Sequence, residues 1–293
     1  MAKATLIIIT HNSARWIEPL VTSYRAAAPG ANIKVIVADC ASTDGTRDAV
    51  SRHWPEATFL ALENIGYGAA ANRAAALTNT DYLIIANADI TFGPRFLAEV
   101  IHPLLQPLSE LPAPPAWHGV ACIAPKLLNT DGTTQDSVGI FPSVGKLLSD
   151  SRRPRTQRKY VQPQPTEPGM IDWATGACLI FRREVFNELG GFDEKFFLYV
   201  EEVDLQRRLW LSGRQTWFAP VVGGEVTHHA PLAQRPLEPQ LAKWAVRGTI
   251  RYFAKHESAG AFLAVKLMGF AARRLSLSET LRSRRGWLEQ STK

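Results

Sequence analysis

Polar side chains gather at the points where apolar, strand-forming runs end. Asp89 is the sharpest case, because only Ala88 separates it from the strand-forming run YLIIAN (82–87). A carboxylate in this position is either a turn residue or an oxygen ligand delivered to the edge of a sheet. Thr10, Asn12, Asp39 and Asn64 share this placement at the other strand ends, and Asn87 ends the same run as Asp89.

Carboxylates and imidazoles also cluster in the second half of the chain. Glu201, Glu202 and Asp204 stand within four positions, at the start of an aromatic-flanked helix. Acids in a first helical turn complement the helix dipole, but three of them together repel, which raises the pKa of one toward that of a general base. The pair His228-His229 follows a short strand and is either a metal or diphosphate contact or a surface pair.

These residues need a sheet to bring them together, and the first ninety positions predict one. Apolar runs alternate there with helical stretches, a pattern typical of a parallel, doubly wound sheet whose ligands bind at the carboxyl ends of the strands. The predicted strands cover 5–10, 34–39, 57–62 and 82–87, and the predicted helices cover 16–28, 47–53 and a stretch opening at Gly66. Later elements are a strand at 173–183, helices at 184–191 and 196–213, short strands near TWFAPV and EVTHHA, and a helical tail from Pro239.

Length and composition describe an ordinary globular chain. It has 293 residues, of which 46% are hydrophobic and 20% charged, enough for one large α/β domain with an appendage. Its three cysteines are far apart and form no CxxC pair, which argues against a disulfide framework or a zinc site and fits a reducing compartment. The apolar run near the N-terminus is too short for a signal peptide, and no stretch is long enough to span a membrane, so we expect a cytoplasmic protein.

The positive charge is concentrated in the tail. Residues 241–293 carry a net charge of +8, whereas the rest of the chain carries −2. Apolar residues recur there at helical spacing among basic ones, which favours contact with an anionic membrane surface; a dimer interface or a helical cover on the main domain is the alternative. The basic loop 151–169 either grips a phosphate-bearing acceptor or is a mobile loop.

A glycine motif raises one rival function. Gly66-x-Gly68-x-x-Ala71 follows a strand, and Asp89 comes about 20 residues later, as in a nicotinamide-dependent oxidoreductase. The motif follows the third strand rather than the first, however. A nucleotide site that uses all strand ends fits better. In such a site Asp39 would accept a hydrogen bond from the imide N–H of uracil or thymine, and the amides of Asn64 and Asn72 would line ribose and phosphate. Asp89 would bind a divalent cation.

Together these segments resemble the family-2 inverting glycosyltransferases of the nucleotide-diphospho-sugar transferase (GT-A type) fold, within them the rhamnosyltransferase-like bacterial enzymes. The resemblance covers roughly residues 4–232 and rests on the order and spacing of seven segments. They are ITHNS, ADCASTDGT, NIGYGAAANRA, IANADI, ATGACLIFRR, GGFDEKFFLYVEEVDLQRR and VTHH. It implies a Rossmann-like mixed sheet flanked by helices, with a C-terminal helical appendage.

The resemblance also assigns roles to the residues at matching positions. Asp89 would bind Mg²⁺ or Mn²⁺ at the place of the family's Asp-x-Asp motif, and His228 would complete the metal or diphosphate site. Glu202 would be the catalytic base, with Asp204 or Glu201 as substitutes. The donor-binding residues would be Thr10 and Asn12 beside the nucleotide, Asp39 on the base, Asn64, Gly66 and Asn72 around the nucleotide sugar, Asn87 in the metal motif, and Gly176 in the cleft between donor and acceptor.

Two departures accompany the match: Asn87 replaces the first acid of Asp-x-Asp, and Glu202 replaces an Asp. The Gln-x-x-Arg-Trp motif of processive members is incomplete at 206–210, which favours transfer of a single sugar. We therefore expect inverting transfer, of rhamnose first, from a dTDP- or UDP-linked donor to a glycan or polyprenyl-diphosphate-linked acceptor in bacterial cell-surface polysaccharide synthesis.

The expected organisation is a catalytic domain at 1–238, divided into a nucleotide-binding half (1–100) and an acceptor-side half (101–238), followed by a basic amphipathic tail at 239–293. Contact with the inner face of the plasma membrane and a homodimer are further expectations, and nucleic acid is not an expected partner. A catalytically inactive sugar-nucleotide-binding scaffold is the second alternative. A sugar-1-phosphate nucleotidylyltransferase is disfavoured, because THNSARW lacks the basic Gly-rich loop that a triphosphate needs.

Overall fold

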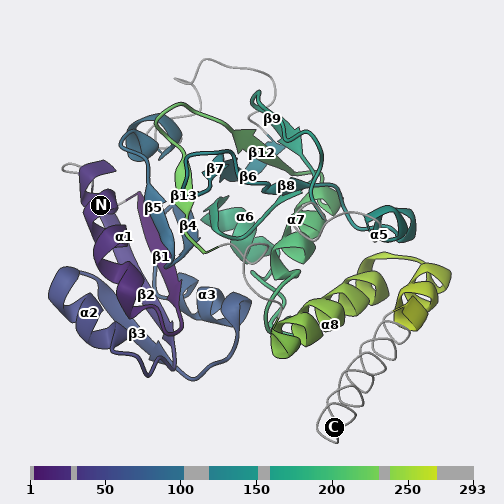
Figure 1. The fold of residues 1–293 in the computed structure, drawn as a ribbon, viewed down its shortest axis with the longest axis horizontal. Coiled ribbons are helices and arrows are strands. Elements are labelled where there is room, and N and C mark those ends of the chain that lie inside the picture. Colours follow the sequence, from purple (N-terminus) through teal and green to yellow (C-terminus); the bar gives the residue numbers. More distant parts are fainter. Residues whose placement is uncertain (1–2, 28–31, 102–118, 151–158, 231–237, 269–293) are drawn as a thin grey trace, which may run out of the picture.

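The computed structural model describes residues 3–27, 32–101, 119–150, 159–230 and 238–268. Within them, one eight-stranded sheet runs through the molecule in the order β3-β2-β1-β4-β11-β6-β12-β9 (Figure 1). Its strands are β1 (Ala4–Thr10), β2 (Ile33–Cys40), β3 (Thr58–Leu62), β4 (Tyr82–Asn87), β6 (Val120–Pro125), β9 (Gly169–Ile171), β11 (Cys178–Arg182) and β12 (Gln215–Ala219). Strands β1 to β4 are parallel, as predicted, and β11 joins β4 antiparallel, so the sheet is mixed.

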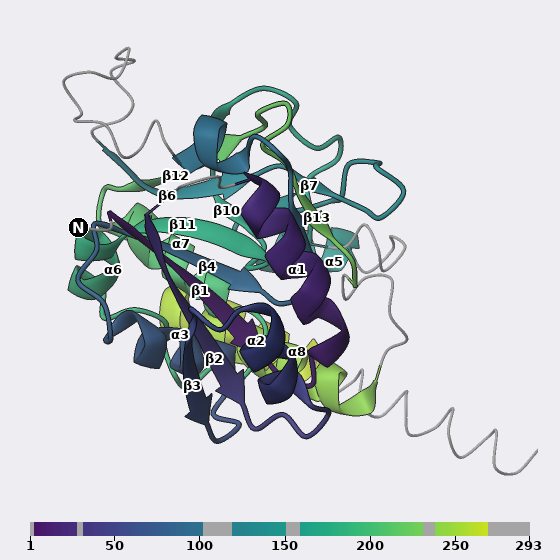
Figure 2. The ribbon, with the colours of Figure 1, turned by 90° about the vertical axis from the view of Figure 1, so that its left-hand side faces the viewer.

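Helices cover both faces of this sheet (Figures 1 and 2). Successive side chains of β1 explain why: Leu6 and Ile8 pack under α1 and α2, whereas Ile7 and Ile9 pack under α3, α6 and α7. The helices are α1 (Ala14–Ala27), α2 (Thr46–His53), α3 (Tyr67–Ala75), the π-helical turn η1 (Phe96–Ile101), α5 (Val144–Asp150), α6 (Arg183–Glu188), α7 (Glu201–Leu211) and α8 (Pro239–His256), followed by helical residues 259–268.

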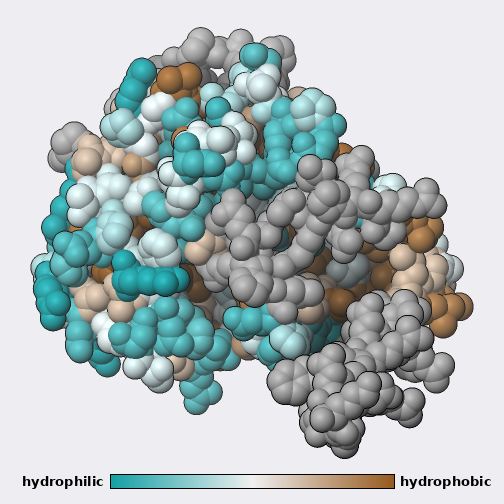
Figure 3. Space-filling view, in the orientation of Figure 1, coloured by the Kyte–Doolittle hydropathy of each residue, from teal (hydrophilic) through white to brown (hydrophobic). Residues whose placement is uncertain are grey.

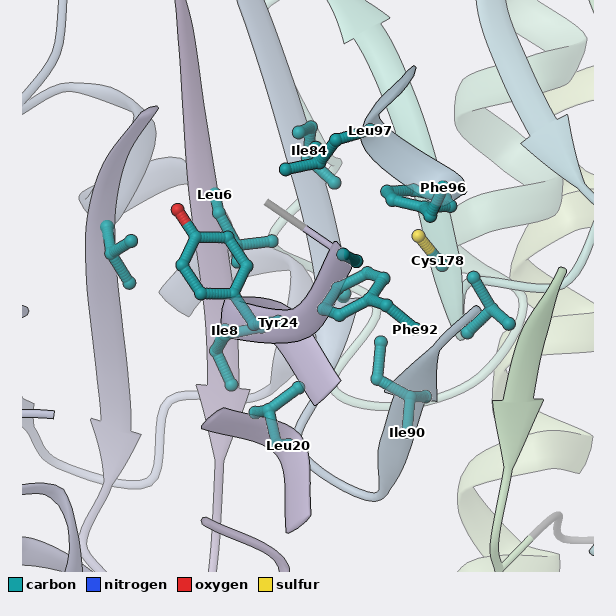
Figure 4. Packing of buried hydrophobic residues seen from close by; sticks show 14 of the residues in the cluster. Leu6, Ile8, Leu20, Tyr24, Ile84, Ile90, Phe92, Phe96, Leu97 and Cys178 are labelled. Atoms are coloured by element: carbon teal, nitrogen blue, oxygen red, sulfur yellow. The ribbon is translucent and has the colours of Figure 1, made fainter. Parts of the chain in front are cut away.

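The apolar core between the sheet and helices α1 and α2 is filled by large side chains. Tyr24 on α1 packs edge-on against Phe92, with ring centroids 6.3 Å apart, and Phe92 packs on Phe96 at 4.8 Å (Figure 4). Burial of large apolar side chains is the dominant stabilising term in such a core, about 1.5–3 kcal/mol for each. The strand ends above it therefore form a fixed edge on which polar side chains can be positioned.

Two small sheets deliver the remaining polar residues to that edge. Strand β13 (Val226–His228) pairs antiparallel with β5 (Ile90–Phe92) and parallel with β7 (Leu127–Leu128), and the His229 amide donates to the Asp89 carbonyl at 2.8 Å. Strands β8 (Val138–Gly139) and β10 (Trp173–Ala174) form the other small sheet. His228 therefore lies beside the end of β4, although 139 residues separate it from Asp89 in the sequence.

Two predicted elements differ from the structure. The strand predicted over 173–183 is divided by a turn at 175–177 into β10 and β11. In this turn the Ala177 carbonyl accepts a hydrogen bond from the backbone N–H of Asn87 at 3.0 Å. The helix predicted from residue 196 begins only at Glu201, because Tyr199 and Val200 have left-handed backbones with φ of 70° and 76°. Both irregularities lie at the carboxyl edge of the sheet and bring residues to it.

Candidate active site

A cavity of about 680 Å³ opens at the carboxyl ends of β1, β2 and β4. Its size is that of a site for a small molecule or cofactor. Of the residues that the sequence singled out, ten line it: Thr10, Asn12, Asn64, Gly66, Asn87, Asp89, Gly176, Glu201, Glu202 and His228. Residues from segments spread over the first 228 positions therefore meet at one site. This site lies at the carboxyl ends of the strands, where α/β sheets bind their ligands.

Asp89 and His228 form one corner of this cavity. The Oδ1 of Asp89 lies 3.4 Å from Nε2 of His228, and the Nδ2 of Asn87 lies 3.4 Å from the same nitrogen. Both Asp89 and His228 are buried. The Nδ1 of His228 hydrogen-bonds to Oε1 of Gln135 at 3.0 Å, which leaves Nε2 as the atom that faces Asp89.

This corner fits a divalent cation that takes few ligands from the protein. In the described part of the chain, no group of three or more His, Cys, Asp or Glu side chains is placed to hold a metal ion. Asp89 and His228 offer one carboxylate and one imidazole side by side. Mg²⁺ commonly uses one or two carboxylates and completes its shell with phosphate oxygens and water. The two side chains therefore suit a cation that arrives with a diphosphate, rather than one held by the protein alone.

Glu201 and Glu202 also line the cavity, at the N-terminus of α7. Burial raises the pKa of both carboxyls; the charge of Glu202 further raises that of Glu201, whereas Lys159 lowers both. The Oε2 atom of each is buried and has no hydrogen-bond partner among the described residues. A buried carboxylate oxygen without a donor is costly, so these oxygens are acceptors held ready for a ligand.

Tyr67 is a site residue that the sequence analysis did not single out. Its hydroxyl donates to the Gly176 carbonyl at 2.8 Å. Burial raises the pKa of Tyr67 well above its usual value, and the charges of Glu201, Glu202 and Asp89 raise it further. Tyr67 lines the same cavity as these three carboxylates. The only sequence signal was its position directly after Gly66.

Three predicted site residues do not line the cavity, and their hydrogen bonds explain why. Asp39 accepts from the hydroxyls of Thr10 (2.7 Å) and Ser42 (2.5 Å) and from the Ser42 amide (3.0 Å), so in this structure its carboxylate organises the turn after β2. Asn72 binds the backbone of Phe192 with both its amide oxygen and its amide nitrogen. These contacts make Asn72 a support of the turn at Gly191, not a wall of the nucleotide pocket.

Asp204 is the third of these residues. It is fully buried and accepts hydrogen bonds from Arg208 (2.9 Å), Lys255 and His256 (2.7 Å). Burial by itself pushes the pKa of Asp204 upward, but His256, Arg208 and Lys255 outweigh it and hold the pKa below its usual value. A carboxylate that accepts hydrogen bonds from Arg208, Lys255 and His256 is a poor proton acceptor, so the base is sought at Glu202 and Glu201.

Comparison with known proteins identifies a family domain in the first part of the chain. A family model described as Glycosyl transferase family 2 matches residues 5–115, the stretch that supplies the strand ends of the cavity. This part of the chain carries a family 2 glycosyltransferase domain.

Named relatives support this match, and the first of them covers more of the chain than residues 5–115. A Mycobacterium tuberculosis protein named N-acetylglucosaminyl-diphospho-decaprenol L-rhamnosyltransferase is 29% identical over 244 residues, which cover 76% of this chain and 75% of the relative. The Escherichia coli rhamnosyltransferase WbbL is 26% identical over 119 residues, 41% of this chain and 44% of the relative.

Solved structures confirm the GT-A fold of the glycosyltransferase. The mannosyltransferase PcManGT from Pyrobaculum calidifontis, solved with GDP-Man and Mn²⁺, superposes with a TM-score of 0.54 at 18% identity, over 92% of this chain and 69% of that one. Residues 1–349 of TarS from S. aureus superpose with a TM-score of 0.52 at 15% identity, over 88% of this chain and 74% of that one.

The glycines of the rival oxidoreductase motif have a different purpose in this glycosyltransferase. A Cβ at Gly66 would lie 2.3 Å from the Phe197 carbonyl oxygen, which accepts from the Tyr67 amide at 3.0 Å. A Cβ at Gly68 would lie 2.7 Å from Cβ of Phe192. Both positions therefore need glycine because protein segments approach there, not because a pyrophosphate must.

Helix α8 belongs to the site of the glycosyltransferase as well as to its tail. Leu241 and Trp244 line the cavity, and the ring of Trp244 packs against Phe197 at 4.5 Å. A Cβ at Gly248 would lie 2.7 Å from the Tyr199 carbonyl oxygen, so α8 presses directly on the left-handed turn that precedes Glu201. The helix thereby helps to hold the two acids at the cavity wall.

The apolar side chains of the tail are divided between buried and exposed positions. Tyr252 and Phe253 are fully buried against Phe196, Val200 and Val203, so α8 is a cover on the catalytic domain. Exposed apolar side chains follow it: Leu263 and Leu267 are 56% and 62% exposed. In Figure 3 apolar surface gathers at the right edge, where α5 and the C-terminal helices lie.

No helix in the described part of the chain is both long and apolar enough to cross a membrane. The tail's Arg273 and Arg274 and residues 151–158 of the basic loop lie outside the described residues. Lys159, the last cation of that loop, does line the cavity. The positive charge that lowers the pKa of Glu201 and Glu202 is therefore that of Lys159 in this loop.

Proposed function

We propose that this glycosyltransferase moves a single sugar, with rhamnose favoured, from a dTDP- or UDP-linked donor to a polyprenyl-diphosphate-linked or glycan acceptor, with inversion of the anomeric centre, in bacterial cell-surface polysaccharide synthesis. The observation that carries the proposal is the convergence of Asp89 and His228 with Glu201 and Glu202 in one cavity. The name of the Mycobacterium tuberculosis relative supports the choice of sugar and of a lipid-linked acceptor.

In this proposal, the donor diphosphate lies at the corner made by Asp89 and His228. These side chains would hold Mg²⁺ or Mn²⁺ there, which when bound supplies positive charge to the departing nucleoside diphosphate. Asn87 removes one negative charge from the motif, and its amide donates to Nε2 of His228. Thr10, Asn12 and Asn64 line the cavity on the nucleotide side.

Glu202 is the proposed base for a single displacement. Its carboxylate takes the proton of the acceptor hydroxyl while the acceptor oxygen forms a bond to the anomeric carbon and the bond from that carbon to the diphosphate oxygen breaks. Attack opposite the leaving group inverts the anomeric centre. A raised pKa suits this role, because a base whose pKa lies nearer the operating pH takes up a proton more readily. Glu201 shares the environment and is the alternative base.

The raised pKa of the acid pair predicts a pH dependence. The base must be deprotonated, so kcat/KM is expected to fall with decreasing pH through an apparent pKa above the usual range of a glutamate, and this value belongs to the pair. Since Lys159 lowers the pKa of both acids, Lys159→Met is expected to move the acid limb to higher pH, and Lys159→Arg to leave it in place. Steady-state kinetics across pH check this; an acid limb that is unchanged in Lys159→Met contradicts it.

The transfer itself is tested by incubating the protein with Mn²⁺, a polyprenyl-diphosphate-linked N-acetylglucosamine and dTDP- or UDP-sugars. The expected result is one sugar added per acceptor from a single donor, with an anomeric configuration opposite to that of the donor by NMR. Donor binding without transfer or hydrolysis under any of these conditions would instead make the protein a sugar-nucleotide-binding scaffold. A product that retains the donor configuration would contradict the single displacement.

A further inference from the structure

His228 is the last member of a chain of hydrogen bonds that begins at the surface. The Thr133 hydroxyl donates to Oδ1 of Asp131 at 2.6 Å, and Nδ2 of Asn129 donates to the same hydroxyl oxygen at 3.0 Å. Oδ1 of Asn129 accepts from Nε2 of Gln135 at 3.2 Å, and Oε1 of Gln135 faces Nδ1 of His228 at 3.0 Å. The chain thus connects an exposed carboxylate to a buried imidazole.

The direction of every bond in this chain is fixed from its outer end. Ionised Asp131 can only accept, so Thr133 donates its single proton to it and must accept from Asn129. The Thr134 carbonyl, 3.5 Å from Nδ2 of Asn129, also accepts only and fixes the same orientation. The amide oxygen of Asn129 therefore faces Gln135, and the amide oxygen of Gln135 faces His228.

The consequence reaches the cavity. Because Oε1 of Gln135 only accepts, neutral His228 carries its proton on Nδ1, and the lone pair is on Nε2, which lies 3.4 Å from Oδ1 of Asp89. The amide of Asn87, which donates to Nε2, agrees with this tautomer. Gln135 and His228 are both only 7% exposed, which limits competition from water for these bonds.

We propose that Gln135, oriented by Asn129, is a positioning residue that sets the tautomer and ring orientation of His228 so that Nε2 is ready to bind a cation beside Asp89. The proposal rests on the metal corner of the proposed function. A partner on the second ring nitrogen typically matters by 10–100-fold in metal affinity. Its loss frees the ring to rotate and to move the proton to Nε2.

Two variants at position 135 separate this role from simple packing. Gln135→Met is similar in length but has no strong acceptor, and Gln135→Glu keeps an acceptor for Nδ1. In metal-free protein labelled with ¹⁵N-histidine, at a pH where the imidazole is neutral, we expect the His228 proton on Nδ1 in the wild type and in Gln135→Glu. In Gln135→Met we expect a shift toward Nε2–H, and a 10–100-fold weaker binding of Mn²⁺ alone, measured by EPR.

A second position tests the direction of the chain without altering Gln135. Asn129→Lys places a donor where Asn129 has an acceptor, so Gln135 is expected to turn its amide and present its NH₂ group to Nδ1, which moves the His228 proton to Nε2. This substitution at a half-buried position also decides the matter if Gln135→Met does not fold. A wild-type His228 that carries its proton on Nε2, or variants that keep both the wild-type tautomer and the wild-type Mn²⁺ affinity, would overturn the proposal.

The tautomer is read without donor, acceptor or metal. Failure of the positioning role would therefore leave sugar transfer untouched. Failure of sugar transfer would likewise leave the tautomer measurement valid.

Discussion

Glu202→Gln is expected to lower kcat by about 10²–10⁴-fold and to leave donor binding nearly unchanged. Glutamine has the shape of glutamate but cannot take up a proton, and Oε2 of Glu202 has no partner among the described residues that the substitution would disturb. Turnover is measured with the preferred donor and acceptor, and donor affinity by calorimetry with the nucleoside diphosphate and Mn²⁺.

Glu201→Gln is the matched control, since both acids lie in the first turn of α7. It removes a neighbouring negative charge, so we expect activity to persist and the acid limb of kcat/KM to move to lower pH. If instead Glu202→Gln is active and Glu201→Gln is inactive, the base is Glu201. Asp204→Asn is expected to reduce stability rather than chemistry, because Asp204 binds Arg208, Lys255 and His256.

A chain that stops after residue 238 is expected not to reach a stable fold. Removal of α8 uncovers the apolar cluster around Phe196, Val200 and Val203 and takes away Tyr252 and Phe253, which are fully buried. Loss of one such aromatic side chain typically costs about 3–5 kcal/mol. A domain has only about 5–15 kcal/mol of stability in total, so the loss of both is comparable to the whole.

Charge makes the same deletion more costly. Arg251 and Lys255 pair with Asp193 at 2.8 and 3.0 Å, and Lys255 and His256 pair with buried Asp204. Without α8, Asp204 loses Lys255 and His256 and keeps Arg208. A buried charge that loses partners is strongly destabilising.

Thermal unfolding followed by circular dichroism checks the deletion, with a chain that stops after residue 268 as control. The control keeps every α8 contact described above and is expected to unfold at a higher temperature than the chain that stops after residue 238. Equal unfolding temperatures for chains ending at 238 and at 268 would show that α8 is a dispensable appendage.

The role of α8 as a cover also decides how membrane contact of the tail should be tested. Deleting the whole tail would confound a liposome assay, because it also removes a structural cover. Membrane binding by the tail is still a prediction. It can be attributed to the exposed side chains of Leu263 and Leu267 and to the basic residues beyond 268. Paired Glu substitutions at these two leucines, assayed by flotation, change that surface while leaving α8 in place. The homodimer likewise stays a prediction.

Strand ends were predictable because apolar periodicity and parallel topology together determine which residues share an edge. Thr10 pairs in register with Asp39, and Ile9 with Asn87, so the polar residues of β1, β2 and β4 had to meet. Which way each side chain turns depends on partners that are remote in sequence. Asn72 faces Phe192 and Asp204 faces His256, at separations of 120 and 52 residues, and no local pattern announces either contact.

Tyr67 and Gln135, which the sequence did not indicate as site residues, also depend on partners that are remote in sequence. Tyr67 reads as one position of an Ala-rich helix, and it gains a role only because the turn at Gly176 comes to its hydroxyl. Gln135 lies in a polar loop, and its importance depends on β13 bringing His228 to it. Helix 196–213 was predicted too long because FFLYV is apolar enough for a helix, whereas the structure uses it as the turn that α8 holds in place.

The most direct test is a crystal of the protein with dTDP and Mn²⁺, with the manganese located by anomalous scattering. We expect one peak between the Asp89 carboxylate and Nε2 of His228, in contact with the diphosphate, with Glu202 facing the open side of the cavity. A nucleotide bound away from Asp89, or manganese bound to other residues while this corner stays empty, would contradict the proposed site.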